Sequence, residues 1–127
     1  MPMFNFKKRN NLADRLSESN RIRMKYPERI PIICEKTNSS SNSVPDLDKS
    51  KYLVPCDLTL GQFMFVIRKR MKLPSENALF LFVKGSIPSS NTIISNLYDA
   101  KKDEDGFLYI NYSGENTFGT LFNIIKN

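Results

Sequence analysis

Residues 57–70 read Asp-Leu-Thr-Leu-Gly-Gln-Phe-Met-Phe-Val-Ile-Arg-Lys-Arg, and this stretch decides the fold. Thr59 and Gln62 have the spacing of a capping box, in which each side chain satisfies a free backbone N–H at the start of a helix. Apolar side chains then recur at helical spacing, so one face of this helix has to be buried. Bases follow at its C-terminal end, where the helix dipole favours cations, and Pro74 is expected to end it. The apolar face consists of Leu60, Phe63, Met64, Ile67 and Met71, and the bases are Arg68, Lys69, Arg70 and Lys72.

Four candidate strands flank this helix. Residues 29–36 and 51–55 form a hairpin with a long polar connection that contains the Ser/Asn-rich segment 38–46. Residues 78–83 are an unbroken apolar run, which is typical of a strand covered on both faces. Residues 107–112 follow an Asp-Gly turn and form the last strand. One helix packed on a four-stranded mixed sheet is the simplest arrangement for this order, which predicts an α+β fold of the ubiquitin-like β-grasp roll type.

Two further helices are predicted outside this core. Asn11 is placed to cap a helix over residues 12–26, and Asp14 lies in its first turn, where a carboxylate meets the positive end of the helix. Pro27 stops this helix. Thr92 is expected to cap a second, short helix. The fold therefore carries an additional helical segment before its first strand.

The charge is unevenly distributed along the chain. The 127 residues suit one domain and carry a net charge of +6. Residues 1–31 hold eight bases and three acids, whereas the rest of the chain has a net charge of only +1. A basic segment favours anionic partners such as lipid headgroups, nucleic acid or acidic peptides, although a solvated helix face would have the same composition. Phe4 and Phe6, which precede the bases at 7–9, either contact anionic headgroups or pack on the domain.

The composition excludes several kinds of chemistry. The sequence has no histidine and two cysteines, so it holds no Cys-His or Ser-His nucleophile pair and no His-bearing zinc site. We expect no metal, no cofactor and no enzymatic activity. Cys34 and Cys56 lie beside apolar residues and are expected to be buried thiols rather than a disulfide. No signal peptide or membrane span is visible, and without an RNA-reading motif no nucleic-acid partner is expected.

Six stretches between residues 29 and 119 point to one family. They are Arg29-Ile-Pro-Ile-Ile-Cys-Glu-Lys36, Asp48-Lys-Ser-Lys-Tyr-Leu-Val-Pro55, Asp57-Leu-Thr-Leu-Gly-Gln-Phe63, Val66-Ile-Arg-Lys-Arg70, Asp105-Gly-Phe-Leu-Tyr109 and Tyr112-Ser-Gly-Glu-Asn-Thr-Phe-Gly119. In order and in register, they resemble the autophagy ubiquitin-like modifiers, which are typified by microtubule-associated protein light chain 3 and the GABA-receptor-associated protein. The resemblance covers residues 12–119.

The resemblance implies a ubiquitin-like modifier of autophagy. A cysteine protease would cut the chain between Gly119 and Thr120, with Phe118 as an apolar handle for the protease. Activating and conjugating enzymes would then carry Gly119 as a thioester to the amine of phosphatidylethanolamine. The implied locations are the cytoplasm and, through the lipid anchor, autophagosome and related vesicle membranes. A non-conjugated β-grasp adaptor that only binds peptides is the alternative function.

The implied domain organisation has three parts. Residues 1–27 form a basic helical extension packed on the domain, residues 28–119 form the ubiquitin-like domain, and residues 120–127 form a tail that processing removes. The tail carries four apolar residues, which either dock on the domain or hinder processing: Leu121, Phe122, Ile124 and Ile125.

The resemblance also implies a peptide-binding groove. Partners in this family, the autophagy receptors, carry an aromatic residue, two variable residues and an aliphatic residue, and they add a strand beside residues 51–55. The implied aromatic pocket uses Glu18, Ile22, Pro31, Ile33, Lys51, Leu53 and Phe107. The implied aliphatic pocket uses Tyr52, Val54, Pro55, Leu58, Phe63 and Val66, and the bases that meet flanking acids are Arg29, Lys49 and Arg70. Phe63, Val66 and Phe107 are equally consistent with plain core positions.

Overall fold

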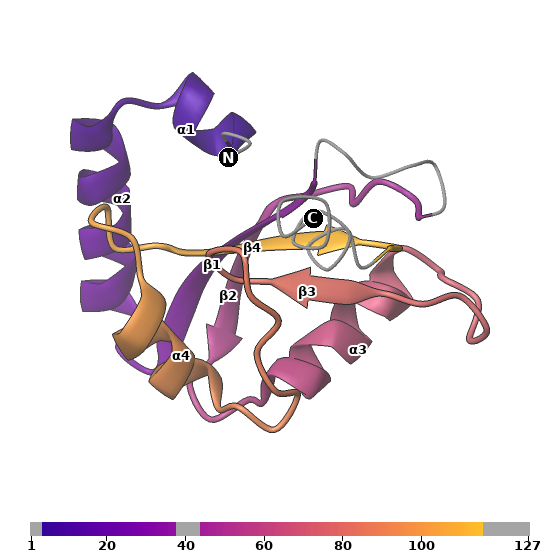
Figure 1. Ribbon diagram of the computed structural model, residues 1–127. Helices are drawn as coiled ribbons and strands as arrows, with labels where there is room; N and C mark the ends of the chain where they lie inside the picture. The colour runs from indigo at the N-terminus through magenta and orange to yellow at the C-terminus, as the bar shows by residue number, and fades with distance from the viewer. Residues whose placement is uncertain (1–3, 38–43, 116–127) are drawn as a thin grey trace, which may run out of the picture.

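A four-stranded mixed sheet forms the centre of the molecule (Figure 1). The computed structural model describes residues 4–37 and 44–115. The strand order is β2-β1-β4-β3, with β1 and β4 parallel and the two outer pairs antiparallel. This arrangement confirms the predicted mixed sheet. The elements are α1 (Asn5–Arg9), α2 (Leu12–Lys25), β1 (Arg29–Lys36), β2 (Lys51–Pro55), α3 (Leu60–Arg70), β3 (Phe80–Phe82), α4 (Ile94–Lys101) and β4 (Leu108–Ser113).

The helix α3 begins as the sequence predicts and buries its apolar face against the sheet. The Thr59 hydroxyl accepts from the Gln62 backbone N–H at 3.1 Å, and the Gln62 side chain accepts from the Thr59 backbone N–H at 2.9 Å. Leu60, Phe63 and Ile67 are at most 1% exposed. The capping box therefore fixes where α3 starts, and burial of this apolar face holds it on the sheet.

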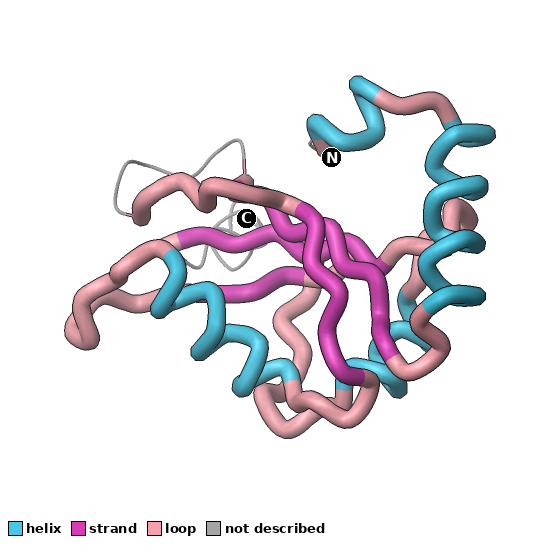
Figure 2. Tube along the Cα trace, turned by 180° about the vertical axis from the view of Figure 1, so that it is seen from behind, coloured by secondary structure: helices cyan, strands magenta, loops and turns pink. Residues whose placement is uncertain are grey.

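The helices α2 and α3 lie on opposite sides of the strands, as Figures 1 and 2 both show. Because successive side chains of a strand point to opposite faces, β1 serves two clusters. Ile30, Ile32 and Cys34 belong to the main core shared with α3. Ile33 belongs to a second core with Ile22 of α2, Phe107 and Tyr109. The N-terminal helical segment is thus part of the packed structure.

The start of the chain contains a short helix, α1, that the sequence analysis did not predict. Of the two alternatives for the N-terminal aromatics, packing on the domain is the one found. The Phe4 ring lies 4.8 Å from the Tyr109 ring, and the Phe6 ring lies 5.1 Å from the Phe107 ring, centroid to centroid. A helix of five residues is unstable alone and shows no periodicity, so tertiary contacts have to supply its stability.

The start of α4 differs from the prediction. Its N-cap is Ile93, without a side-chain capping bond, so the expected Thr92 cap is wrong. The Thr92 carbonyl instead accepts from the Leu60 backbone N–H at 2.8 Å. Pairing with the start of α3 therefore decides the backbone before α4, and this long-range contact overrides the local capping preference.

Two other elements end earlier than expected. The helix α3 ends at Arg70 rather than at Pro74, because Lys72 adopts a left-handed conformation with φ of 56°. The strand predicted over residues 78–83 forms as β3 over Phe80–Phe82 only, at an edge of the sheet. The apolar residues around it are nevertheless buried, in agreement with coverage of both faces: Leu79, Leu81, Phe82 and Val83.

The two cysteines are free thiols, as predicted. Cys34 is 1% exposed, and burial raises the pKa of its thiol well above the ordinary value. Cys56 is only partly buried, so the expectation that both thiols are buried is wrong for this one. It lies in the turn after the edge strand β2, where the sheet ends.

Candidate functional site

The candidate site is built around β2, which is an edge strand of the sheet. Its antiparallel register with β1 is fixed by hydrogen bonds on either side of the strand. The Cys34 backbone N–H donates to the Ser50 carbonyl at 2.7 Å, and the Cys56 backbone N–H donates to the Glu28 carbonyl at 3.0 Å. Hydrogen-bonded and non-hydrogen-bonded pairs alternate along an antiparallel ladder. Every second residue of β2 therefore directs its backbone groups to the open edge.

Lys51 and Leu53 are the residues with outward-facing backbone groups. Leu53 stands opposite Pro31 in the register, at a position where a missing N–H costs no ladder hydrogen bond. The Leu53 carbonyl accepts from the Arg29 guanidinium at 3.2 Å, which places this oxygen within reach of a group outside the ladder. An extended peptide that pairs with β2 would use these same backbone groups.

The residues predicted for the aromatic pocket lie on the α2 side of the sheet. Ile33 and Phe107 are fully buried and can form only the floor. Ile22 of α2 is 8% exposed, and Leu53 is a partly buried neighbour of the same cluster. Pro31 is buried as well. The structure thus brings the apolar members of this set together around one surface next to the edge strand.

A charged pair lies beside this apolar surface. The Lys51 ammonium contacts the Glu18 carboxylate, which joins β2 to α2. The same ammonium lies 5.4 Å from the centre of the Phe6 ring. The two charged side chains are partly exposed, at 41% for Lys51 and 21% for Glu18. Because an exposed pair of this kind contributes little stability, a ligand can displace it at small cost.

Most of the residues predicted for the aliphatic pocket lie on the opposite, α3 side, whereas alternation along β2 places Pro55 on the same face as Leu53. Tyr52 and Val54 are buried in the main core, and the Tyr52 ring meets the Phe63 ring edge-on at 5.6 Å. Phe63 is fully buried, whereas Val66 on the next turn is 45% exposed. Of the positions that were open to a plain core interpretation, Phe63 and Phe107 are core and Val66 is surface. Leu58 is partly buried and Pro55 is exposed.

The three predicted basic residues differ in their availability. Arg70 is bound to Asp48 through two hydrogen bonds of 2.7 and 3.1 Å. This guanidinium lowers the pKa of the Asp48 carboxyl below its ordinary value. The Lys49 ammonium lies 4.8 Å from the centre of the Tyr52 ring. Arg29 is exposed and donates to the Leu53 carbonyl. Because Arg70 is already paired with Asp48, an acidic residue of a partner would have to compete with Asp48 for it.

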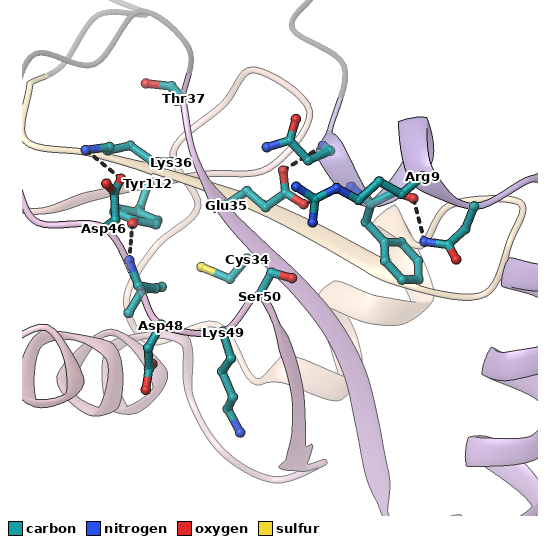
Figure 3. A pocket seen from close by; sticks show the side chains of 14 residues that line it. Arg9, Cys34, Glu35, Lys36, Thr37, Asp46, Asp48, Lys49, Ser50 and Tyr112 are labelled. Carbon is teal, nitrogen blue, oxygen red and sulfur yellow. Dashed lines mark hydrogen bonds and ion pairs between the residues drawn. The ribbon is translucent and has the colours of Figure 1, made fainter.

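A pocket lies between α1 and the end of β1 (Figure 3). This pocket of about 570 Å³ is lined by α1, the end of β1 and the segment 46–50, and it includes one predicted site residue, Lys49. Figure 3 shows Glu35 between β1 and α1, where its carboxylate accepts from the backbone N–H groups of Asn5 and Phe6 at 2.8 and 3.1 Å. Glu35 therefore anchors α1 on the sheet.

A buried ionic cluster that was not predicted from the sequence lies beneath the aromatic side. Asp105 is fully buried, and its carboxylate lies 2.6 Å from the Arg15 guanidinium of α2. Tyr109 donates its hydroxyl to the same carboxylate at 2.5 Å. The Asp-Gly pair was identified only as a turn signal. No local pattern could have paired Arg15 with a residue ninety positions away.

A family model described as "Autophagy protein Atg8 ubiquitin like" matches residues 14–119 of the chain. The chain belongs to the Atg8 family. Autophagy-related protein 8a of Arabidopsis thaliana is 58% identical over 95% of this chain and 98% of that protein. Autophagy-related protein 8 of Mycosarcoma maydis is 54% identical over 91% of this chain and 97% of that protein. The sequence resemblance to this family is therefore confirmed, and with it a role as an autophagy-related ubiquitin-like protein.

The fold agrees with that of a solved Atg8 protein. The crystal structure of Trypanosoma brucei ATG8 superimposes with a TM-score of 0.83 and 41% sequence identity, over 88% of this chain and 95% of that one. This match confirms the ubiquitin-like fold that the sequence predicts for this chain.

Two other kinds of site are absent from the part of the chain that the structure describes. None of its helices combines the length and the apolar character that a bilayer span requires. No group of three or more acidic or cysteine side chains there is arranged to hold a metal ion. The predicted cleavage and lipidation residues Phe118, Gly119 and Thr120, like the tail 120–127, lie outside the described residues.

Proposed function

We propose that this Atg8 protein is cut after Gly119, conjugated to phosphatidylethanolamine, and recruits partners to autophagosome membranes through the groove around β2. Hydrolysis of the bond before Thr120 frees the Gly119 carboxylate. The activating enzyme uses ATP to convert this carboxylate to an acyl adenylate with release of pyrophosphate, and an enzyme thiol displaces AMP to form a thioester. The conjugating enzyme receives the thioester, and the lipid amine displaces its thiol to form an amide. Family membership supports the pathway, and the family match ends at residue 119 itself.

Lipid attachment supplies membrane binding without a spanning helix. Each buried CH₂ group contributes about 0.8 kcal/mol, and a single acyl chain anchors a protein only marginally. Phosphatidylethanolamine brings two chains, so conjugated protein stays on the bilayer. Residues 28–119 form the ubiquitin-like unit of the proposal, with residues 1–27 as the extension packed on it.

The single observation that carries the groove proposal is the position of β2 between two different surfaces. Side chains of an added strand alternate between the two faces of the sheet. Residues three positions apart in such a strand therefore point to opposite faces. The surface around Leu53 and Ile22 lies on the α2 side, and the surface around Val66 and Leu58 lies on the α3 side. A peptide with an aromatic residue, two variable residues and an aliphatic residue fits this geometry.

The expected affinity is modest. Burial of two side chains contributes about 1.5–3 kcal/mol each, and each hydrogen bond to the β2 edge adds about 0.5–1.5 kcal/mol. Ordering of the peptide and loss of its free motion offset part of this gain. A dissociation constant in the micromolar range, about 8 kcal/mol, is the expected result.

Peptide fluorescence tests the groove cleanly, because the chain contains no tryptophan. A synthetic peptide with a Trp-x-x-Leu motif is titrated with the purified chain, and the indole emission reports binding. Leu53→Ala and Val66→Ala should each weaken binding about tenfold, which corresponds to about 1.4 kcal/mol. Ile87→Ala is the matched control, since Ile87 is 43% exposed and lies outside the groove. Equal affinity of all four proteins would refute the groove.

Tyr52 is unsuitable for this test. It is 5% exposed and packs on Phe63 in the main core, so Tyr52→Ala would damage the fold as well as the groove. Leu53 and Val66 are preferable because both are accessible and neither fills the main core.

The processing step is tested by mass spectrometry. Exposure to the cognate protease should remove Thr120–Asn127, and Gly119→Ala should reduce the cut. With the activating and conjugating enzymes and liposomes containing phosphatidylethanolamine, the trimmed protein should yield a faster-migrating, membrane-pelleting form. An intact mass, with the protease active on another family member, would contradict the proposal. Peptide binding without any conjugation would favour the non-conjugated adaptor.

A further inference from the structure

The buried carboxylate of Asp105 is bonded through both of its oxygen atoms. The residue is fully buried in the turn before β4. Its Oδ2 atom lies 2.6 Å from the Arg15 guanidinium and accepts from the Tyr109 hydroxyl at 2.5 Å. Its Oδ1 atom accepts from the Phe107 backbone N–H at 2.9 Å. A buried charge is stable only when it is paired and hydrogen-bonded in this way.

These contacts join the floor of the aromatic side to the helix α2 beside it. Phe107 is the fully buried floor of the aromatic side, and Asp105 holds its backbone directly. Arg15 belongs to α2, the helix whose next turns carry Glu18 and Ile22. The Asp105 carboxylate is therefore a direct link between the floor and the helix that forms the opposite wall.

A second contact reinforces the link between the turn and α2. The Ser19 hydroxyl donates to the Asp105 carbonyl at 2.5 Å. Ser19 is 1% exposed and lies three residues before Ile22 on the same helix. The close approach depends on Gly106, where a Cβ atom would stand 2.4 Å from the Ser19 hydroxyl. The spacing between α2 and the turn is thus set by hydrogen bonds at very short range.

We propose that Asp105 is a positioning residue that fixes α2 relative to Phe107 and so sets the width of the aromatic half of the peptide groove. This inference rests on the proposed function of the groove. The motif's aromatic side chain enters between α2 and β2, and its fit depends on how far α2 stands from the floor. The aliphatic half lies on the other face of the sheet, against α3, and none of the contacts of Asp105 reaches it.

Asp105→Asn is the principal test, because it keeps the size of the side chain and removes its charge. The amide loses the ionic contact with Arg15, and one of its ends presents donors to groups that are themselves donors. Tyr109→Phe is the second, milder variant, since it removes only the hydroxyl that contacts Asp105 and Arg15 and leaves the Asp105–Arg15 ion pair in place. It carries the test if Asp105→Asn fails to fold. Ile94→Val in the main core controls for a general loss of stability away from the groove.

The readout is the environment of the bound indole rather than affinity alone. The Trp-x-x-Leu peptide is titrated to saturation, and the emission maximum and acrylamide quenching of its single tryptophan are measured. Asp105→Asn should bind about tenfold more weakly, and Tyr109→Phe should shift both readouts in the same direction to a smaller extent. At saturation the indole should emit at longer wavelength and be quenched more readily than with the unaltered chain. Ile94→Val should leave both properties unchanged.

A peptide pair separates the two halves of the groove. Changing the motif's aliphatic residue from Leu to Ala should cost the same factor in affinity with Asp105→Asn as with the unaltered chain. An unchanged indole signal at saturation in the folded variants would overturn the positioning role while leaving the groove intact. A change of the Leu-to-Ala factor would also overturn it. Failure of the unaltered chain to bind the peptide would overturn the groove and this inference together.

Discussion

The replacement of Gly106 by alanine gives the sharpest test of how α2 packs on the turn before β4. Gly106 has a φ of 89°, in the region that L side chains rarely adopt. Alanine at such a φ costs about 1–2 kcal/mol. Its Cβ would also stand 2.4 Å from the Ser19 hydroxyl oxygen and 3.0 Å from the Ser19 Cβ. Relief of this overlap costs a further 1–3 kcal/mol, roughly, because α2 has to move.

Gly106→Ala should therefore lower the free energy of unfolding by about 2–5 kcal/mol, as measured by urea denaturation at neutral pH. Ser19→Gly removes the atoms that the new Cβ would strike. By itself it should cost about 2 kcal/mol, from helix propensity and the lost bond to the Asp105 carbonyl. In the double variant the overlap disappears and only backbone strain is added. The double variant should then lose about 2 kcal/mol less than the sum of the single losses.

Gly85→Ala is the matched control for backbone strain. Gly85 has a φ of 79° in the turn after β3. This variant should lose about 1–2 kcal/mol and show no coupling to Ser19→Gly. Losses of Gly106→Ala and Ser19→Gly that add within about 0.5 kcal/mol would refute the proposed contact between α2 and the turn.

Three further predictions concern pH and the ends of helices. Burial works to raise the pKa of Asp103, but hydrogen bonds from Lys7 and the backbone outweigh it and hold this pKa below its ordinary value. The stability that this carboxylate contributes is complete above about pH 4 and is lost as the pH falls through the folded-state pKa. Asp103→Asn lacks this contribution, so between about pH 5 and pH 3 its urea midpoint should fall less than that of the unaltered chain. Lys72→Gly should raise the free energy of unfolding by about 1 kcal/mol at its φ of 56°, and an unchanged urea midpoint would contradict this. Thr59→Ala removes the capping box and should lower the free energy of unfolding by about 1 kcal/mol. A thermal midpoint equal to that of the unaltered chain would refute this.

Much of the fold could be predicted from local pattern. Asn11 caps α2 by accepting from the Asp14 backbone N–H at 2.8 Å, as the sequence indicates, and the Thr59–Gln62 capping box starts α3. These signals succeed because the groups that satisfy a helix end lie within three residues of it. The Ile93 cap of α4 could not be predicted in this way, because backbone bonds to the start of α3 decide it.

The residues of the proposed groove show the same division. The sequence could place its residues only through the resemblance to the family. The edge position of β2 and the burial of Phe63 and Phe107 come from the assembled sheet. The neutralisation of Arg70 by Asp48 likewise depends on a contact between segments twenty-two residues apart. Charge and exposure at the groove are therefore properties of the packed structure.

Residue identity and spacing along the chain were enough to predict where α2 and α3 begin, the apolar face of α3 and the family. The packing of α1 on the second core and the link that Asp105 makes between α2 and Phe107 became visible only in the folded chain. Residues far apart in the chain make these contacts, and their energies depend on burial and on distances that no local spacing encodes.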